Sequence, residues 1–207
     1  MGLVIGVTGG IGTGKTTVTD FLHQRYECKI LDADVLAREA VAPGSEGLDA
    51  IARRYGLTML RPDGTLDRSR LGRLVFDQPR ERKWLEQLIH PWVRNALEAG
   101  MKTWRDSTVP NAPPLILAIP LLFEAKLEYL VDEIWVVTCE EAVQRQRIME
   151  RDSLEIADAQ RRIDAQMPLA QKCDRANVVI QNNDSLPTLR HSVDITYQRL
   201  RLIDQKH

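Results

Sequence analysis

The residues best suited to chemistry lie near the start of the chain, in a segment that fits the pattern G-x-x-x-x-G-K-[ST] without a mismatch. The residues expected to hold a nucleotide are Gly9, Gly10, Ile11, Gly12, Thr13, Gly14, Lys15, Thr16 and Thr17. Glycines let backbone N–H groups turn inward around phosphate oxygens, because no Cβ crowds the anion. Lys15 supplies a positive charge for the β- and γ-phosphates, and the Thr16 hydroxyl can bind Mg²⁺. The pattern predicts a phosphate-binding loop (P-loop) for ATP and Mg²⁺.

Three carboxylates are candidates for the acceptor side of a phosphoryl transfer. Asp32 and Asp34 follow a short apolar run, and one residue separates them, so both side chains could point the same way. One could orient and deprotonate an acceptor hydroxyl while the other contacts Mg²⁺ through water. The alternative is that one of them only caps a helix that starts at Val35. Glu124 follows a later apolar run and could organise metal or substrate, or simply begin a helix.

Arginines on a helical pattern are candidates for binding the phosphates from another side. Arg147 and Arg151 are four residues apart and therefore share one helix face. Guanidinium groups donate paired hydrogen bonds to phosphate oxygens. A helical lid that carries them would close over ATP and exclude water. The alternative is an exposed helix laced with salt bridges, because Glu150 and Asp152 are interleaved with these arginines.

Asp67 and His90 are weaker candidates for contacts with the substrate. Asp67 lies in a Gly-Thr-Leu-Asp-Arg segment, and His90 precedes Pro91 between two helical patterns. A histidine in such a place is more often packed or capping. We expect both residues to take part in substrate binding if the surrounding segment forms a substrate site.

The elements that must position these residues alternate between short apolar strands and helices. The expected strands are Leu3–Thr8, Lys29–Leu31, Leu115–Ile119, Glu133–Thr138 and Asn177–Gln181. The expected helices outside the long connection are Thr16–Tyr26, Glu140–Arg151, Glu155–Gln166 and Leu186–Ile203. Such alternation predicts an α/β fold, with a five-stranded parallel sheet flanked by helices.

One connection is much longer than a crossover requires. About 80 residues separate Asp34 from Pro114. This stretch has helical patterns at Leu48–Tyr55, Leu71–Phe76, Arg80–Leu88 and Pro91–Trp104, with turn residues Pro62-Asp63-Gly64 among them. One interpretation is that the helical insert only packs against the core and has no role in binding. The favoured interpretation is a helical substrate-binding insert at the carboxyl edge of the sheet, where open α/β sheets place their ligands.

Composition narrows the classes of partner. Lys and Arg number 28 and Asp and Glu 29, giving a net charge of −1, so no global attraction to nucleic acid or membranes is expected. The three cysteines form no C-x-x-C pair, which disfavours a disulfide framework or a zinc site. Pro113–Phe123, the longest apolar run, is too short to span a bilayer. We expect a cytoplasmic enzyme that is a monomer or weak homo-oligomer.

Several motifs in order along the chain resemble those of the dephospho-CoA kinase family. They are TGGIGTGKTT at Thr8–Thr17, LDADVLAR at Leu31–Arg38, DGTLDR at Asp63–Arg68, LIHP at Leu88–Pro91, PLLFE at Pro120–Glu124 and RIMERD at Arg147–Asp152. The P-loop is shared by many families, whereas its combination with D-A-D-x-x-A-R and the His-Pro pair is far more specific. One mild departure is that Thr13 and Thr16 stand where family members often have serine, and Thr16 keeps the hydroxyl.

The resemblance implies phosphorylation of the ribose 3′-hydroxyl of dephospho-CoA by ATP, the final step of coenzyme A synthesis. It implies that Asp34 is the base and Arg147 the lid arginine, although the residues alone do not decide between Asp32 and Asp34. It also implies three parts. They are a nucleotide-binding core of residues 1–34, 113–140 and 175–207, a helical CoA-substrate insert of residues 35–112, and a lid of residues 141–174.

Three other functions fit parts of the sequence less well. Another small-molecule P-loop kinase, for a nucleotide, nucleoside or shikimate-like alcohol, would not need so long an insert. A GTPase switch would carry N-K-x-D and D-x-x-G strings, and neither occurs in the sequence. A regulatory module that only binds ATP would not need a pair of carboxylates at the phosphate edge.

Overall fold

The structure is a computed structural model that describes residues 2–107 and 112–204 of the 207-residue chain. The chain divides into two compact units: the core unit, Met1–Leu31 with Met101–His207, and the insert unit, Asp32–Gly100. The insert expected from the sequence was residues 35–112, and residues 108–111 of that range lie outside the described residues. The three-part division expected from the sequence stays a prediction.

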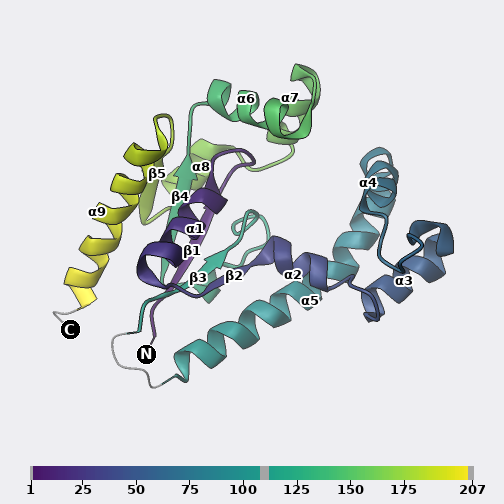
Figure 1. Ribbon diagram of the computed structural model, residues 1–207, viewed down its shortest axis with the longest axis horizontal. Helices are drawn as coiled ribbons and strands as arrows, with labels where there is room; N and C mark the ends of the chain where they lie inside the picture. Colours follow the sequence, from purple (N-terminus) through teal and green to yellow (C-terminus); the bar gives the residue numbers. More distant parts are fainter. Residues whose placement is uncertain (1, 108–111, 205–207) are drawn as a thin grey trace. The chain divides into compact units, whose positions relative to one another are not determined.

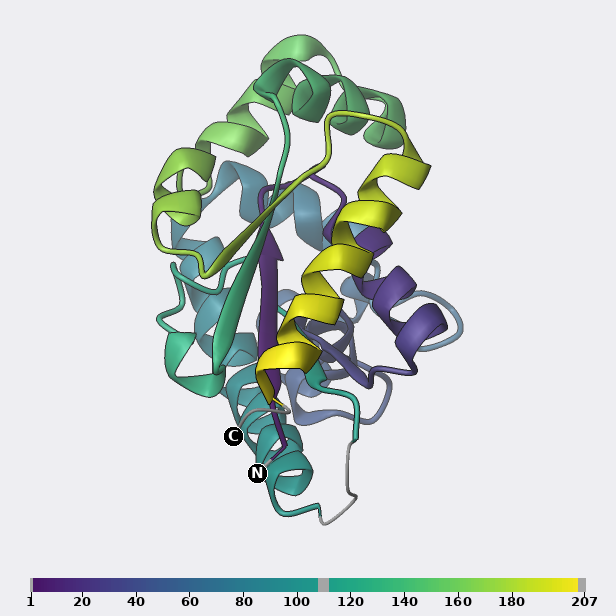
Figure 2. The same cartoon turned by 90° about the vertical axis from the view of Figure 1, so that its left-hand side faces the viewer.

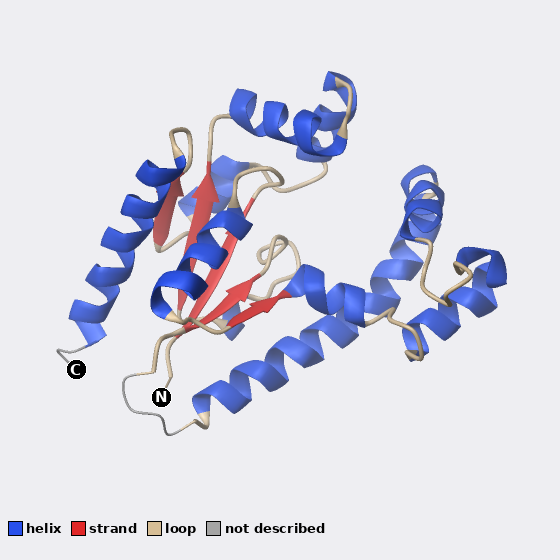
Figure 3. Ribbon diagram, in the orientation of Figure 1, coloured by secondary structure: helices blue, strands red, loops and turns tan. Residues whose placement is uncertain are grey.

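One or more helices follow each strand along the chain, except that β3 and β4 are joined by the short turn η2 alone (Figures 1 and 3). The strands are β1 (Val4–Gly9), β2 (Ile30–Asp32), β3 (Leu115–Ala118), β4 (Glu133–Thr138) and β5 (Val178–Gln181). The helices are α1 (Lys15–Tyr26), α2 (Ala33–Glu39), α3 (Glu46–Tyr55), α4 (Arg68–Asp77), α5 (Pro79–Arg105), α6 (Glu141–Asp152), α7 (Ile156–Asp164), α8 (Leu169–Asp174) and α9 (Leu186–Asp204). Within the described residues there are also two 3-10 turns, η1 (Leu57–Met59) and η2 (Glu128–Leu130).

The strands form one sheet in the order β2-β3-β1-β4-β5. β1 pairs in parallel with both β3 and β4, and β4 pairs in parallel with β5. The register matches Val7 with Ala118 and Gly9 with Val137, so the carboxyl ends of neighbouring strands lie at one edge. The expected five-stranded parallel sheet is confirmed. This edge collects the segments that follow β1, β3, β4 and β5, which is where ligands bind in open α/β sheets.

The core unit buries both faces of its sheet. α1 and α9 pack on one face, and Figure 2 shows α8 on the opposite side of β4 from α9. Every second residue of a strand points to the same face, so Ile5 and Val7 join Trp135 and Val137 in the cluster under α1 and α9. Each of these four side chains is fully buried. Burial of such a side chain stabilises the fold by roughly 1.5–3 kcal/mol.

The insert unit has a separate apolar cluster of its own. Its buried members are Val41, Leu48, Ile51, Met59, Leu66 and Leu71. The expected turn forms, with the Gly64 N–H donating to the Arg61 carbonyl at 2.9 Å, and Gly64 takes a φ of 78° that favours glycine. The cluster and the turn together join α3, η1 and α4 into one small unit.

The sequence prediction was wrong in one place in this unit. Two helices were expected on either side of His90-Pro91, but α5 runs continuously through Pro91. Proline in a helix interior removes the hydrogen bond to the carbonyl four residues earlier, which usually ends the helix. Here the apolar periodicity continues on both sides of Pro91, and burial of Val93 and Leu97 outweighs the lost bond. α8, a six-residue helix, was not anticipated.

The longest helix, α5, is too polar to cross a lipid bilayer. No other helix of the described residues has the length and hydropathy that a membrane span requires.

Candidate active site

The P-loop lies between β1 and α1, at the carboxyl edge of the sheet. Gly14 precedes α1 with a φ of 95°, and a Cβ there would lie 2.2 Å from Nδ2 of Asn182. Only glycine fits this position, because both the backbone conformation and the neighbouring side chain exclude a Cβ. No side chain among the described residues caps the start of α1, and its first turn has no acidic residue. The N–H groups and positive dipole end of α1 are therefore available to an anion.

Side chains from three later segments hold the P-loop in shape. The Ile11 N–H donates to Oε1 of Gln166 at 2.8 Å, and Nε2 of Gln144 donates to the Ile11 carbonyl at 2.7 Å. Nδ2 of Asn182 donates to the Thr13 carbonyl at 2.7 Å. The loop conformation is thus fixed by residues of α6, of the segment before α8 and of the segment after β5.

The last residues of the pattern lie in the first turn of α1. Lys15 and Thr17 are half-buried, whereas Thr16 is exposed. The Thr16 carbonyl accepts a hydrogen bond from the Thr19 hydroxyl at 3.0 Å, a contact that does not involve the Thr16 hydroxyl. Thr16 is thus an exposed residue at the start of α1, within the segment expected to hold the phosphates.

Arg147 lies on α6, one helical turn beyond Gln144. Its Nη1 atom is buried and has no hydrogen-bond partner among the described residues. A buried donor without an acceptor costs about 1–3 kcal/mol, so this guanidinium is suited to receive an anionic oxygen. Burial raises the pKa of the neighbouring Cys139 thiol, and the Arg147 charge offsets part of that rise. The Cys139 thiol therefore remains protonated at neutral pH and does not neutralise Arg147.

Arg151 makes different contacts from Arg147. Its guanidinium donates to both carboxylate oxygens of Asp152, at 2.8 and 2.9 Å, and Arg162 also pairs with this carboxylate. These hydrogen bonds, first of all the one from Arg151, hold the pKa of Asp152 below its usual value. The salt-bridged arrangement considered from the sequence is therefore present, and nucleotide binding by Arg151 stays a prediction.

Glu124 is held in place by a buried lysine. Lys172 is fully buried in α8, and its Nζ lies 2.9 Å from Oε1 of Glu124 and donates to the Pro120 carbonyl at 3.0 Å. The same Glu124 oxygen accepts from the Met167 N–H at 3.0 Å. The Pro120 carbonyl also accepts from the Thr8 hydroxyl at 3.2 Å. This network joins the segment after β3 to the end of β1, and thus to the P-loop.

The two aspartates of the D-A-D motif belong to the insert unit and differ in their contacts. Asp32 is the N-cap of α2, and its Oδ1 accepts from the Asp34 N–H at 2.7 Å and more weakly from the Val35 N–H at 3.4 Å. The capping role considered from the sequence is therefore the one that Asp32 performs. Asp34, the second residue of α2, is exposed.

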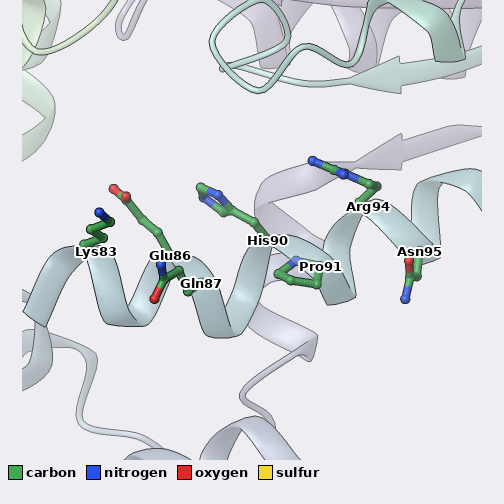
Figure 4. A pocket seen from close by; sticks show the side chains of 7 residues that line it. All are labelled: Lys83, Glu86, Gln87, His90, Pro91, Arg94 and Asn95. Carbon is green, nitrogen blue, oxygen red and sulfur yellow. The ribbon is translucent and has the colours of Figure 1, made fainter.

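The other two candidates of the insert unit lie on different helices. Asp67 is the N-cap of α4, where its Oδ1 accepts from the Arg70 N–H at 3.0 Å. His90 is exposed on α5 and lines a hollow of about 430 Å³. The side chains that line it are Lys83, Glu86, Gln87, His90, Pro91, Arg94 and Asn95 (Figure 4). Figure 4 shows that Glu86, His90 and Arg94 project from the same side of the helix. Substrate contact by Asp67 and His90 stays a prediction.

Comparison with known proteins identifies the family. The family described as dephospho-CoA kinase matches residues 3–188. A dephospho-CoA kinase from Trichormus variabilis is 50% identical over 192 residues, covering 93% of this chain and 95% of that protein. This chain belongs to the dephospho-CoA kinase family.

Solved structures agree with this assignment. Dephospho-CoA kinase from Campylobacter jejuni is 27% identical with a TM-score of 0.71, and 95% of this chain and 96% of that chain are covered. The protein TT1252 from Thermus thermophilus is 33% identical with a TM-score of 0.75, covering 96% and 98% of the two chains. The match to the dephospho-CoA kinase family therefore extends to the fold of nearly the whole chain.

Sequence reasoning missed four residues of this dephospho-CoA kinase site, Gln144, Gln166, Lys172 and Asn182. The two glutamines lie in polar helical patterns, and nothing in such a pattern marks one glutamine as buried. Gln144 has only 2% of its surface exposed because α6 packs on the P-loop. Lys172 resembles any helical lysine in the sequence. These roles come from contacts between segments far apart in the chain, which spacing does not reveal.

Proposed function

We propose that this protein transfers the γ-phosphate of ATP to the ribose 3′-hydroxyl of dephospho-CoA, giving CoA and ADP as the final step of coenzyme A synthesis. The observation that carries the proposal is a complete P-loop at the carboxyl edge of the sheet in a member of the dephospho-CoA kinase family. The cytoplasmic location and the monomeric or weakly oligomeric state expected from the sequence remain predictions.

The core unit supplies the groups that bind and stabilise the transferred phosphate. Phosphoryl transfer proceeds through a loose transition state, so positioning and charge stabilisation account for most of the catalysis. Lys15 binds the β- and γ-phosphates at the P-loop, beside the start of α1. Arg147 donates hydrogen bonds to oxygens of the transferred phosphoryl group and stabilises the negative charge that develops on them. Its Nη1, which is buried and has no hydrogen-bond partner among the described residues, supports this role. We also propose that residues 141–174 form a lid that carries Arg147 and Arg151 over the nucleotide.

The side chains at the P-loop are compatible with a magnesium ion that is bound mainly by the phosphates of the nucleotide. No cluster of three or more His, Cys, Asp or Glu side chains within the described ranges could hold a metal ion. Mg²⁺ commonly keeps several waters and binds through few protein groups together with substrate phosphates. Thr16 would supply the protein hydroxyl. When bound, the ion neutralises part of the charge on the phosphate oxygens.

The contacts of the D-A-D motif favour Asp34 over Asp32 as the group that orients the acceptor hydroxyl. Asp32 already accepts hydrogen bonds from two backbone N–H groups, so its Oδ1 is engaged in capping the start of α2. Asp34 is exposed at the second position of α2 and can accept a proton from a bound alcohol. We assign Asp34 as the base and Asp32 as the residue that holds the start of α2 in place.

The remaining candidates serve the substrate. We propose that residues 35–112 form the part that binds dephospho-CoA, with Asp67 and His90 among its contacts and Glu124 contributing from the core unit. Glu124 is suited to this because Lys172 and the Met167 N–H fix one of its oxygens. A carboxylate held in this way loses little conformational entropy when it binds a ligand.

The test measures ADP release from ATP and Mg²⁺ with and without dephospho-CoA, for the wild type and for Asp34→Asn. Strong stimulation with CoA as the product, and a large loss in the variant, would establish the reaction and the role of Asp34. A protein that binds ATP but is not stimulated would be an ATP-binding module or a kinase for another alcohol. Asp32→Asn is the matched variant, and we expect it to lower stability more than Asp34→Asn does.

A further inference from the structure

Two arginines of the insert unit are held together without a carboxylate partner. Arg68 is the first residue of α4, and its Nη2 donates to the carbonyl of Arg38, near the end of α2, at 3.1 Å. Neither guanidinium forms an ion pair with any residue that the structure describes, although ion pairs occur elsewhere in this unit, as between Arg54 and Glu81. The contact joins the end of one helix to the start of another and brings two positive side chains into one region.

The surroundings of Arg68 are electropositive. Burial first, and then the charges of Arg38 and Arg61, lower the pKa of Arg68. Arg61 has a nearby carboxylate, since hydrogen bonds from Thr65 and then the charge of Arg61 lower the pKa of Asp63. Among the described residues, neither Arg38 nor Arg68 lies within ion-pair distance of a carboxylate. Two like charges that the fold keeps close together are stabilised when a multivalent anion lies between them.

The spacing on α2 relates this pair to the proposed base. Asp34 and Arg38 are four residues apart, so they share one face of the helix and are separated by about 6 Å along its axis. In dephospho-CoA, only part of the sugar ring and one methylene separate the 3′-hydroxyl from the phosphate on the 5′ oxygen. One face of α2 can therefore bind the acceptor hydroxyl at Asp34 and the adjoining phosphate at Arg38.

We propose that Arg38 and Arg68 form the subsite for the diphosphate group of dephospho-CoA. The proposal rests on the function proposed above. Each guanidinium presents a fork of N–H donors that matches two phosphate oxygens, and binding of the dianion relieves the repulsion between the two side chains. The other arginines of α4 are already engaged: Arg70 donates to the Thr58 carbonyl and Arg73 to the Ser69 hydroxyl.

Steady-state kinetics of Arg68→Gln and Arg38→Gln test the subsite. Loss of a charge-assisted hydrogen bond to phosphate should raise KM for dephospho-CoA about ten- to a hundredfold, while KM for ATP stays unchanged. The KM of Arg68→Lys for dephospho-CoA should lie between those of wild type and Arg68→Gln, because lysine keeps the positive charge but cannot donate two parallel hydrogen bonds. Arg73→Gln on the same helix is the control and should match wild type. An unchanged KM for dephospho-CoA in both glutamine variants would overturn the proposal.

A second measurement tests whether the two arginines recognise the diphosphate group itself. It does not depend on the overall activity of the variants. Adenosine and adenosine 5′-diphosphate are compared as inhibitors against dephospho-CoA at saturating ATP. The diphosphate should inhibit better than adenosine in wild type, and this advantage should disappear in Arg68→Gln and Arg38→Gln. An advantage that persists in both variants would refute the subsite even if the variants were poorly folded.

Calorimetric binding of dephospho-CoA without ATP distinguishes the two proposals. If wild type binds this ligand, the glutamine variants bind it weakly and no CoA forms, the proposed reaction fails while the subsite stands. If the glutamine variants bind it as tightly as wild type, the subsite fails whatever the reaction.

Discussion

The two units of the chain hold their candidate residues in place in different ways. In the core unit the P-loop is held by Gln144, Gln166 and Asn182, which lie 133, 155 and 169 residues from their partners. In the insert unit Asp32 and Asp67 are held by N–H groups two or three residues further along. The nucleotide side of the site thus depends on long-range packing, and the expected substrate side on short-range caps.

This difference has a consequence for stability and motion. A P-loop contact can be lost only if whole segments separate, so we expect the loop to open no more easily than the sheet. A capped helix start can fray by itself, because its hydrogen bonds are local. Substitutions in the two regions should therefore differ in size and in how far their effects spread.

The largest effect is expected for Lys15→Met, which removes a charge from the phosphate site. We expect kcat to fall about a hundred- to a thousandfold, the loss typical for one stabilising donor in the transition state. Steady-state rates at saturating ATP and dephospho-CoA measure this, with Lys126→Met, at an exposed position, as the control. A loss below tenfold would show that the P-loop lysine is not needed for the transfer.

Lys172→Met should cost stability rather than directly remove a catalytic group. Two acceptors, the Pro120 carbonyl and Glu124, lose their buried donor, and we expect a loss of about 2 kcal/mol in the free energy of unfolding. Urea denaturation measures it. Adding Glu124→Gln should cost less in this background than in wild type, because the two residues share one interaction. Full additivity would mean that the pair does not couple the segments.

Asp67→Ala should have a smaller effect, confined to the start of α4. Loss of the N-cap costs about 1 kcal/mol, and Asp67→Ser should recover most of it because serine also caps helices. Denaturation of both variants gives the two values. If Asp67 also binds substrate, Asp67→Ser will regain stability without regaining the wild-type KM for dephospho-CoA.

The smallest effect is expected for Asp152→Asn, which tests a local contact within the core unit. The pKa of Asp152 is lowered in the folded protein. Its contribution to the free energy of unfolding is therefore complete above the pKa of about 3.9 in the unfolded chain, and is lost as the pH falls through the pKa in the folded protein. We expect less than about 1 kcal/mol at neutral pH, because the ion pairs are partly exposed. The difference from wild type should vanish in acid. A difference that persists there would point to a packing change instead.

Sequence alone predicted those features that local chemistry determines. The five strands and the P-loop follow from apolar runs and from a glycine pattern that phosphate binding requires, and the family comparison agrees with the motifs. The break expected at Pro91 was wrong because packing on both sides carries α5 past a residue that normally ends helices. Gln144 and Lys172 were missed because a polar residue on a helix gives no sign of which distant segment will cover it.

The glycines of the P-loop are constrained from outside the loop as well as from within. A Cβ on Gly10 would lie 2.6 Å from Nε2 of Gln144, and a Cβ on Gly12 would lie 2.9 Å from Ile148. The loop must therefore fit against α6 on one side and, as proposed above, leave room for the nucleotide on the other. A side chain at Gly12 would therefore have to displace Ile148 and the Gln144 carbonyl of α6, whatever it did to phosphate binding.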